Sequence, residues 1–414
     1  MRPDDTERRI RSWLDEGPEL APDDLIESVL AHVPATRRRP RWAVAELPLN
    51  SRLAALLSVA VVVVLVVALS WVWLGRIASP GTSTSGPGTF VRLATAADFG
   101  NVSISDAITV GSGIVAVGTT SVGGHDSVSV WSSPDGLAWA RSPSDPAFVD
   151  TTAGRLAERG NRIVLAGYSC PAGGIYCGDS RLFLAISGGA WQAATGIVSG
   201  FSYNAVAAGG TRFVAVGTVE DSLGDVNGVV ATSIDGLSWS ETAPDAMAGA
   251  TIGGVAAGPA GLVAVGQIGG QGIVRTSTDG QTWTRIWSPP TGGTLTDVAW
   301  IGSHWVAVGS GAGRAMAWTS SDGTTWQPVQ TGSGLDGSTV DRITAIGSQL
   351  IALGESTPGD GAAWQSSDGT SWSRLQTGDI FTNAGISAVA SINGRVVLFG
   401  ASASGQALVA VGAP

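Results

Sequence analysis

The stretch SSDGTTW, residues 320–326, returns as SSDGTSW at residues 366–372. Looser copies, SPDGLAW, SIDGLSW and STDGQTW, begin at Ser133, Ser233 and Ser277. A serine, an aspartate, a glycine and a tryptophan therefore keep the same offsets five times. Repetition of this kind indicates a chain built from copies of one supersecondary unit.

A second phrase, an apolar run that ends in glycine, divides the chain into seven units 43 to 50 residues long. The final glycines are Gly118, Gly167, Gly217, Gly266, Gly309, Gly354 and Gly400. In the fifth unit the runs DVAWIGS, HWVAVG, RAMAWTS and TTWQPVQ follow one another, with Gly, Ser and Asp between them. Four short runs of this composition predict a four-stranded antiparallel sheet. Seven such sheets predict an all-β fold, a seven-bladed β-propeller.

The two ends of the repeat region predict how the ring closes. The seventh unit stops at ALVAVGAP, residues 407–414, after three strands. Near the other end, FVRLAT at 90–95 matches WSRLQT at 372–377, with the aromatic, Arg, Leu and Thr at identical offsets. An early strand that completes the last sheet would remove its exposed edge. We expect residues 89–95 to pair with the strand near Leu408.

The S-x-D-G-x-x-W box has a physical role in such a sheet. The Asp-Gly pair favours a tight turn between the third and fourth strands, and the carboxylate and the serine hydroxyl can accept N–H groups of that turn. The tryptophan can bury a large area against the neighbouring sheet. We therefore interpret these residues as determinants of the fold: Asp135, Trp139, Asp235, Trp239, Asp279, Trp283, Asp322, Trp326, Asp368 and Trp372.

The boxes resemble the Asp-box, or bacterial neuraminidase repeat, of sialidases and of propellers similar to photosystem II assembly factors. The resemblance covers about residues 89–414, although these copies lack one residue between Asp and Gly. The second unit is reduced to SGGAW, with Trp191, and the seventh has no box. In that family the box is structural and lies away from the active centre.

The N-terminal part predicts a single membrane anchor. Residues 53–75 carry no charge, and as a helix they would extend about 35 Å, enough to cross a bilayer. Five arginines flank the N-terminal side of this segment: Arg37, Arg38, Arg39, Arg41 and Arg52. This bias predicts a cytoplasmic N-terminus and an extracytoplasmic C-terminal domain, as in a bacterial cell-envelope protein. Residues 76–88 have the composition of a flexible linker.

Residues 1–50 predict two short helices on the cytoplasmic side. They would either dock a cytoplasmic partner or form a weakly folded tail whose RRRPRW stretch faces lipid. In the outer part, Cys170 and Cys177 are the only cysteines of the chain. Their spacing and an oxidising compartment predict a disulfide, with an unpaired couple as the alternative.

Catalytic patterns are sparse. The family resemblance implies a sialidase, which needs an arginine cluster, a tyrosine nucleophile with a glutamate partner, and an acid. The usual R-I-P tripeptide is absent, and the only tyrosines are Tyr168, Tyr176 and Tyr203. We assign no catalytic residue, no metal site and no cofactor. The net charge of −10 and the absence of a basic stripe argue against a nucleic-acid partner.

Loops that follow the apolar runs of the first three units are the candidate binding region, because sites concentrate on loops. They hold His125, Asp126, Tyr168, Tyr176, Asp179, Glu220, Asp221 and Asp225. An acidic patch here would bind a cation, an amine or a basic protein segment; plain solvated loops are the alternative. The sequence thus predicts a membrane-anchored module that binds an extracytoplasmic protein or carbohydrate, as a sensor or scaffold. A sialidase-like glycoside hydrolase is the alternative.

Overall fold

The computed structural model describes residues 89–93, 99–169, 179–197, 201–220, 224–289, 292–330, 332–335, 337, 339–357 and 359–413. By its contacts the chain divides at Thr82 and Ser83, and all described residues belong to the second part. The predicted helices in 1–50, the predicted span 53–75, the linker 76–88, and Cys170, Cys177, Tyr176 and Asp221 lie outside these ranges. Among the described residues, no helix has the length and hydropathy to cross a membrane.

Five sheets of four antiparallel strands follow one another along the chain, as the four runs per repeat predict. Unit 1 contains β2 (Ser103–Val110), β3 (Gly113–Val122), β4 (His125–Ser133) and β5 (Ala140–Arg141). Unit 2 contains β6 (Thr151–Arg159), β7 (Arg162–Ser169), β8 (Ser180–Ile186) and β9 (Gln192–Ala193). Unit 3 contains β10 (Phe201–Gly209), β11 (Arg212–Glu220), β12 (Val226–Ser233) and β13 (Ser240–Thr242). Unit 4 contains β14 (Thr251–Gly258), β15 (Gly261–Ile268), β16 (Gln271–Ser277) and β17 (Thr284–Trp287). Unit 5 contains β18 (Thr294–Ile301), β19 (His304–Gly311), β20 (Arg314–Ser320) and β21 (Gln327–Pro328).

A sixth sheet has eight strands and consists of two four-stranded halves. Unit 6 contains β22 (Thr339–Ile346), β23 (Gln349–Thr357), β24 (Asp360–Ser366) and β25 (Ser373–Arg374). Unit 7 contains β26 (Ala384–Ile392), β27 (Arg395–Ser402), β28 (Ala407–Gly412) and β1 (Val91–Arg92). A single parallel bridge, Asp360 to Ala384, joins the halves. Two 3-10 turns, η2 (Pro146–Phe148) and η3 (Asp245–Met247), precede β6 and β14.

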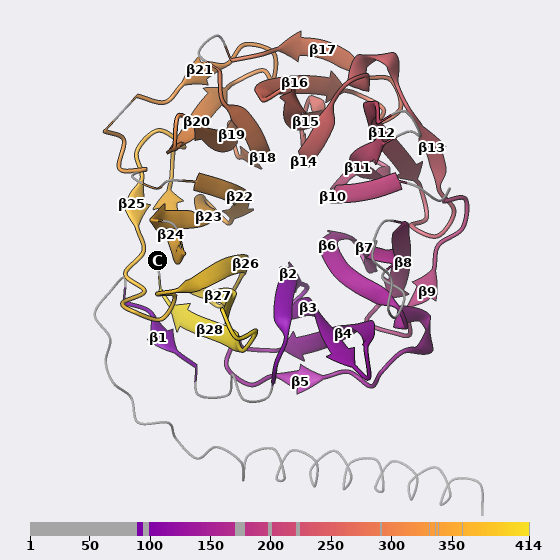
Figure 1. Ribbon diagram of the computed structural model, residues 1–414, viewed down its shortest axis with the longest axis vertical. Coiled ribbons are helices and arrows are strands. Elements are labelled where there is room, and N and C mark those ends of the chain that lie inside the picture. Colours follow the sequence, from indigo (N-terminus) through magenta and orange to yellow (C-terminus); the bar gives the residue numbers. More distant parts are fainter. Residues whose placement is uncertain are drawn as a thin grey trace, which may run out of the picture. The chain divides into compact units, whose positions relative to one another are not determined.

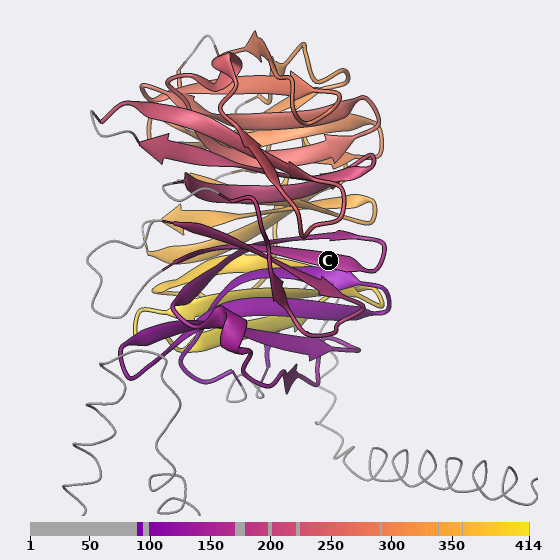
Figure 2. The same cartoon turned by 90° about the vertical axis from the view of Figure 1, so that its right-hand side faces the viewer.

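The sheets are arranged around a central axis, with the first strand of each unit innermost (Figure 1), and Figure 2 shows the same sheets from the side. This is the arrangement of a β-propeller, in which radial repetition leaves only short sheet edges.

The N-terminal strand β1 completes the last sheet, and this confirms the pairing predicted from FVRLAT. Val91 pairs with Val411 and Arg92 with Ala410, both antiparallel. The N–H of Leu93 donates to the Val409 carbonyl at 2.8 Å. The outer edge of β28 is therefore covered by a segment more than 300 residues earlier in the chain.

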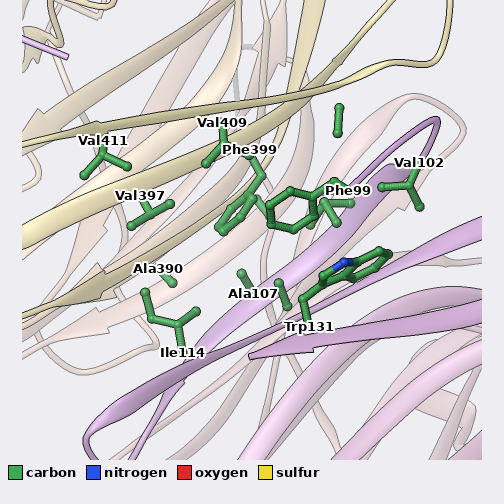
Figure 3. Close-up of a cluster of buried hydrophobic side chains, with 14 of the residues drawn as sticks. Phe99, Val102, Ala107, Ile114, Trp131, Ala390, Val397, Phe399, Val409 and Val411 are labelled. Carbon is green, nitrogen blue, oxygen red and sulfur yellow. The ribbon is translucent and has the colours of Figure 1, made fainter. Parts of the chain in front are cut away.

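The core lies between the units. Seven clusters of buried hydrophobic residues each combine side chains from two neighbouring units. Figure 3 shows the cluster between units 7 and 1, where Phe99 lies 5.3 Å from Trp131 and 6.3 Å from Phe399, measured between ring centroids. Each sheet thus buries both faces, which explains why the middle strands are nearly continuous apolar runs.

The five box turns share one set of hydrogen bonds, illustrated by unit 5. The Ser320 Oγ accepts the Gly323 N–H at 2.9 Å and donates to Asp322 Oδ1 at 3.0 Å. That oxygen also accepts the N–H groups of Thr324 and Thr325, each at 2.7 Å. These two N–H donors are the main reason that the pKa of Asp322 lies well below its usual range.

The box tryptophan then anchors the turn to the preceding unit. The Trp326 Nε1 donates to the Gly323 carbonyl at 3.0 Å, and the buried indole packs in the cluster between units 4 and 5. Gly323 has a φ of +76°, and a Cβ there would lie 3.2 Å from Val263, so the turn requires glycine for both reasons. Trp239, Trp283 and Trp372 pack in the same way against units 2, 3 and 5.

Candidate functional site: a polar cavity among the innermost strands

Every innermost strand contains a register shift near its start. The extra residue at each shift is Ser105, Gly154, Asn204, Gly253, Thr296, Asp341 or Ser387. A β-bulge bends the strand and re-aims the side chains beside it. Here seven bulges occur at equivalent positions, so they bring polar side chains of different units toward one another.

A cavity of about 590 Å³ lies among these strand starts. Units 1, 2, 3, 6 and 7 contribute to its wall. It is lined by Ser105, Ala153, Gly154, Arg155, Tyr168, Ser202, Tyr203, Asn204, Asp341, Arg342, Ile386 and Ser387. Because Tyr168 lies one residue before the end of β7, opposite Thr152 of β6, the cavity opens on the side of the loops between second and third strands. The box turns, which connect third and fourth strands, lie on the other side.

Arg342 connects three units inside this cavity. Its Nη2 forms an ion pair with Asp106 Oδ1 at 2.7 Å, and both side chains are about nine-tenths buried. Its Nη1 donates to the Ser105 carbonyl at 2.8 Å and to the Ser387 carbonyl. The guanidinium of unit 6 therefore reaches across unit 7 to unit 1, at the seam where the ring closes.

Asp106 and Asp297 occupy equivalent positions, and each joins its unit to the next. Asp106 accepts the N–H of its neighbour Ala107 and that of Leu156 in unit 2, each at 2.8 Å. Asp297 accepts the N–H of Val298 at 2.9 Å and that of Ile343 in unit 6 at 3.1 Å. Burial raises the pKa of Asp297 to about 6, and the charge of Arg155 and the two N–H donors oppose this rise.

Arg155 and Asp341 are the charged groups of the cavity that the ion pair does not use. Burial raises the pKa of Asp106, Asp297 and Asp341, and the charge of Arg155 opposes each rise. The charge of Glu355 adds to the effect of burial on the pKa of Asp341. Asp341 and Asn204 are exposed and Arg155 is half-buried, so a ligand in the cavity can reach a cation, an anion and an amide.

The two tyrosines of the wall interact with different carboxylates, Tyr203 with Glu241 and Tyr168 with Asp126. The ring of Tyr203 is 5 % exposed, and its hydroxyl donates to Glu241 on β13, the outermost strand of unit 3. Burial and Glu241 raise the pKa of this phenol far above its usual range. Burial and the charge of Asp126 likewise raise the pKa of Tyr168.

The structure brings together some of the loop residues proposed from sequence. His125 Nδ1 lies 2.8 Å from Asp150 Oδ1, and Asp126 accepts a hydrogen bond from Thr152 at 3.3 Å. Tyr168 lines the cavity and interacts with Asp126. The other described loop residues are exposed and do not line it: Asp179, Glu220 and Asp225. Within the described ranges, no three His, Cys, Asp or Glu side chains are grouped to hold a metal ion.

Sequence reasoning missed the charged residues inside the strands, although a signal was present. Counting twelve residues back from the repeated glycine of each unit gives Asp106, Arg155, Ala205, Gly254, Asp297, Arg342 and Ala388. Four charged residues thus occupy one position of an otherwise apolar strand. An alignment of the seven units on their glycines would have singled out this position.

Comparison with known proteins supports the fold. No protein-family model and no curated protein matches the sequence. Among solved structures, YCF48 bound to D1 peptide matches with 14% identity and a TM-score of 0.53, covering 82% of this chain and 100% of that chain. The β-propeller domain of the Trilobed protease from Pyrococcus furiosus matches with 10% identity and a TM-score of 0.50, covering 75% of this chain and 95% of that chain.

Sialidases are also among the matches. Trypanosoma rangeli sialidase in complex with the inhibitor DANA has 13% identity and a TM-score of 0.45, and the match covers 75% of this chain and 55% of the sialidase. At such identities the similarities to YCF48 and to the protease domain show the β-propeller fold alone.

Proposed function

We propose that the chain is a membrane-anchored, seven-bladed β-propeller whose cavity binds a polar segment of a partner protein without hydrolysing it. The blade count treats the two halves of the eight-stranded sheet as two blades. The observation that carries the proposal is the cavity itself, whose wall contains a cation at Arg155, an anion at Asp341 and an amide at Asn204. A peptide backbone with a charged side chain can satisfy all three groups, and surrounding loops supply further contacts.

The peptide is also the first ligand class to test because YCF48, which shares the fold, has been solved with a peptide bound. His125, Asp126 and Tyr168 lie at or beside the loops on the side where the cavity opens, so these loops form part of the surface around its mouth. Asp150 and Asp126 make this rim acidic, which favours a partner segment with a basic residue.

Three features support binding over the sialidase-like alternative. A tyrosine nucleophile must lose its proton, and the pKa values of Tyr168 and Tyr203 are both raised. The tyrosine–glutamate pair, Tyr203 with Glu241, is directed away from the cavity. Of the two arginines in the wall, Arg342 is already held by Asp106 and two carbonyl groups.

The test places a photo-crosslinking amino acid at position 204 of the full-length chain in its native membrane. Asn204 is exposed and lines the cavity, so a bound segment should form an adduct there. The matched control is the same amino acid at Ile234, which is 65% exposed in a box turn on the other side of the ring. We expect adducts at 204 and not at 234, and we expect Arg155→Gln to reduce them by roughly tenfold or more because a charge-assisted contact is lost.

Equal yields of adduct at the two positions, or no effect of Arg155→Gln on the yield at 204, would contradict binding of the partner segment in the cavity. A fluorogenic sialoside provides the second arm: turnover by the full-length chain that disappears in Tyr168→Phe would establish the hydrolase instead.

The anchor and the cytoplasmic part remain proposals on residues outside the described ranges. We propose that residues 53–75 span the bilayer once, with 1–50 in the cytoplasm and a disulfide between Cys170 and Cys177 outside. We also propose that the box aspartates stabilise turns and do not bind ligand. Protease treatment of intact cells should remove the propeller and leave a short N-terminal fragment; the reverse result would invert the topology.

A further inference from the structure

At one position of the repeat, unit 4 carries an arginine where the other units with a box carry an apolar residue. The residue four places before the box aspartate is Trp131, Ala231, Trp318 or Trp364 in the other units with a box, and it is Arg275 in unit 4. Arg275 is 4% exposed, so it is nearly as buried as the tryptophans that occupy this position in units 1, 5 and 6. A buried cation at such a position costs free energy unless a negative group compensates it.

The groups around Arg275 do not supply that compensation. Its Nε donates to the Ala246 carbonyl at 2.6 Å and its Nη1 to the Val274 carbonyl at 2.9 Å. On the adjacent strand β17, the residue directly opposite is Arg285, whose Nη2 donates to the Asp245 carbonyl at 2.8 Å. Within the described part of the chain, no carboxylate forms an ion pair with either guanidinium.

Two like charges therefore face each other across β16 and β17, an arrangement that destabilises a sheet. Burial, and then the charge of Arg285, lowers the pKa of Arg275 to about 10. The equivalent arginines of units 1 and 6 face tryptophan instead: Arg141 is opposite Trp131 and Arg374 is opposite Trp364. The guanidinium of Arg141 lies 5.5 Å from the centre of the Trp131 ring, a favourable contact.

A hollow of about 400 Å³ adjoins the two arginines. Besides Arg275 and Arg285, its wall contains the polar residues Gln271 and Ser288 and the apolar residues Ile268 and Ile273, which belong to the side of the sheet that faces unit 3. A register shift between Val274 and Arg275 in the pairing of β16 with β17 lies beside the hollow. The volume is that of a site for a small molecule or one terminal residue of a peptide.

We propose that this hollow on the outer part of unit 4 is a carboxylate-binding site. Arg275 and Arg285 would hold the carboxylate, and Ile268 and Ile273 would contact an apolar group attached to it. Two guanidinium groups match the two oxygens of a carboxylate, and the bound anion removes the repulsion between them. The ligand is either a small free carboxylic acid or the C-terminal residue of a peptide, which present the same chemistry.

The test is calorimetric titration of the full-length chain in a non-ionic detergent and a low-chloride buffer, since chloride screens and competes. The probes are 3-methylbutanoate and N-acetyl-leucine, with their neutral amides and inorganic phosphate as controls. Binding of both acids and of neither amide supports the site. Tighter binding of N-acetyl-leucine identifies a C-terminal residue as the source of the carboxylate, and equal binding identifies a free acid. Binding of phosphate alone, or of no probe, overturns the proposal.

Three variants assign the binding to the two arginines. Arg285→Gln changes an exposed side chain, and Arg275→Ala introduces the residue that unit 3 carries at this position, so both should fold. Each should weaken binding by roughly tenfold or more, because one charge-assisted contact is lost. The matched control, Arg374→Gln, removes the equivalent arginine of unit 6 and should leave the affinity within about twofold. An equal loss in all three variants, with the fold intact by circular dichroism, would overturn the assignment.

Discussion

Replacing Phe90 with alanine tests whether the N-terminal strand holds the ring closed. Phe90 is 4% exposed and packs in the cluster between units 6 and 7, beside Leu375, Leu398 and Leu408. A buried phenylalanine removes at least about 150 Å² from water, which at about 25 cal/mol per Å² corresponds to about 4 kcal/mol. Measured Phe→Ala substitutions in cores fall in the same range, about 3–5 kcal/mol.

The loss should be local, because β1 contacts its sheet through few hydrogen bonds. Val91 and Arg92 pair with β28, and Phe90 N–H donates to the Gln376 carbonyl at 3.0 Å. We expect the opening of β1 and β28 to become easier by most of this energy, so their amides should exchange roughly a hundred- to a thousandfold faster. Amides of β14 and β15, on the opposite side of the ring in Figure 1, should keep their exchange rates.

Hydrogen exchange of the full-length chain, read by mass spectrometry, measures both effects. The matched control is Val91→Ala, because Val91 belongs to the same strand and is 43% exposed. That variant should change the exchange of the seam by less than about threefold, corresponding to a stability change of about 0.5 kcal/mol. Equal exchange in the two variants would refute the idea that Phe90 locks the seam.

Further predictions concern the cavity, the boxes and one turn. Arg342→Met leaves Asp106 buried without its ion pair and should lower the free energy of unfolding by about 3–5 kcal/mol, and adding Asp106→Asn should recover part of the loss; an unchanged denaturation midpoint contradicts this. Two turn N–H donors chiefly lower the pKa of Asp279 to about 2 from 3.8, so its contribution to stability is complete above pH about 4 and is lost as the pH falls toward 2; Asp279→Asn should flatten the acid side of the stability profile, and an identical profile contradicts the role. Gly369→Ala places a Cβ 2.4 Å from Val306 at a φ of +67° and should cost about 1–3 kcal/mol, whereas Gly378→Ala, at φ +58° with open space, carries only the backbone strain; equal melting temperatures would rule out the contact.

The strands and turns of each unit could be predicted, because the residues that form them are close together in the sequence of each repeat. The box of residues 320–326 contains its own turn, cap and anchor, and the side-chain hydrogen bonds that shape the turn lie within these seven residues. The closing strand could also be predicted, since residues 90–95 repeat the pattern of 372–377, a strand that occupies the same place in another unit.

The repeat position of the charged residues could have been found by aligning the units, but the contacts that build the cavity could not be predicted, because they join residues far apart in the chain. Arg342 and Ser105 are 237 residues apart, and nothing near either residue indicates that they meet. The register shifts that turn these side chains toward the axis leave no distinct local pattern, since Ser, Gly, Asn, Thr and Asp all occupy the shifted position. We placed the candidate binding region on the loops because the loops are polar. The cavity instead depends on charged residues within strands that are otherwise largely apolar.

The pairing of β1 with β28 has a mechanical consequence. The chain that precedes residue 89 leaves the propeller through β1, so tension on that chain acts first on this strand. Among the described residues, the contacts that resist the pull are the short ladder to β28, the bridge of Thr89 to Gln376, and the hydrogen bonds and side chains of Phe90 and Leu93. Arg342 and Ser387 connect units 6, 7 and 1 from the axis, so a load that peels β1 from the rim leaves the inner contacts of the seam in place. A propeller pulled through the chain before β1 should therefore yield in two stages, with the outer contacts of β1 lost before the contacts at the axis.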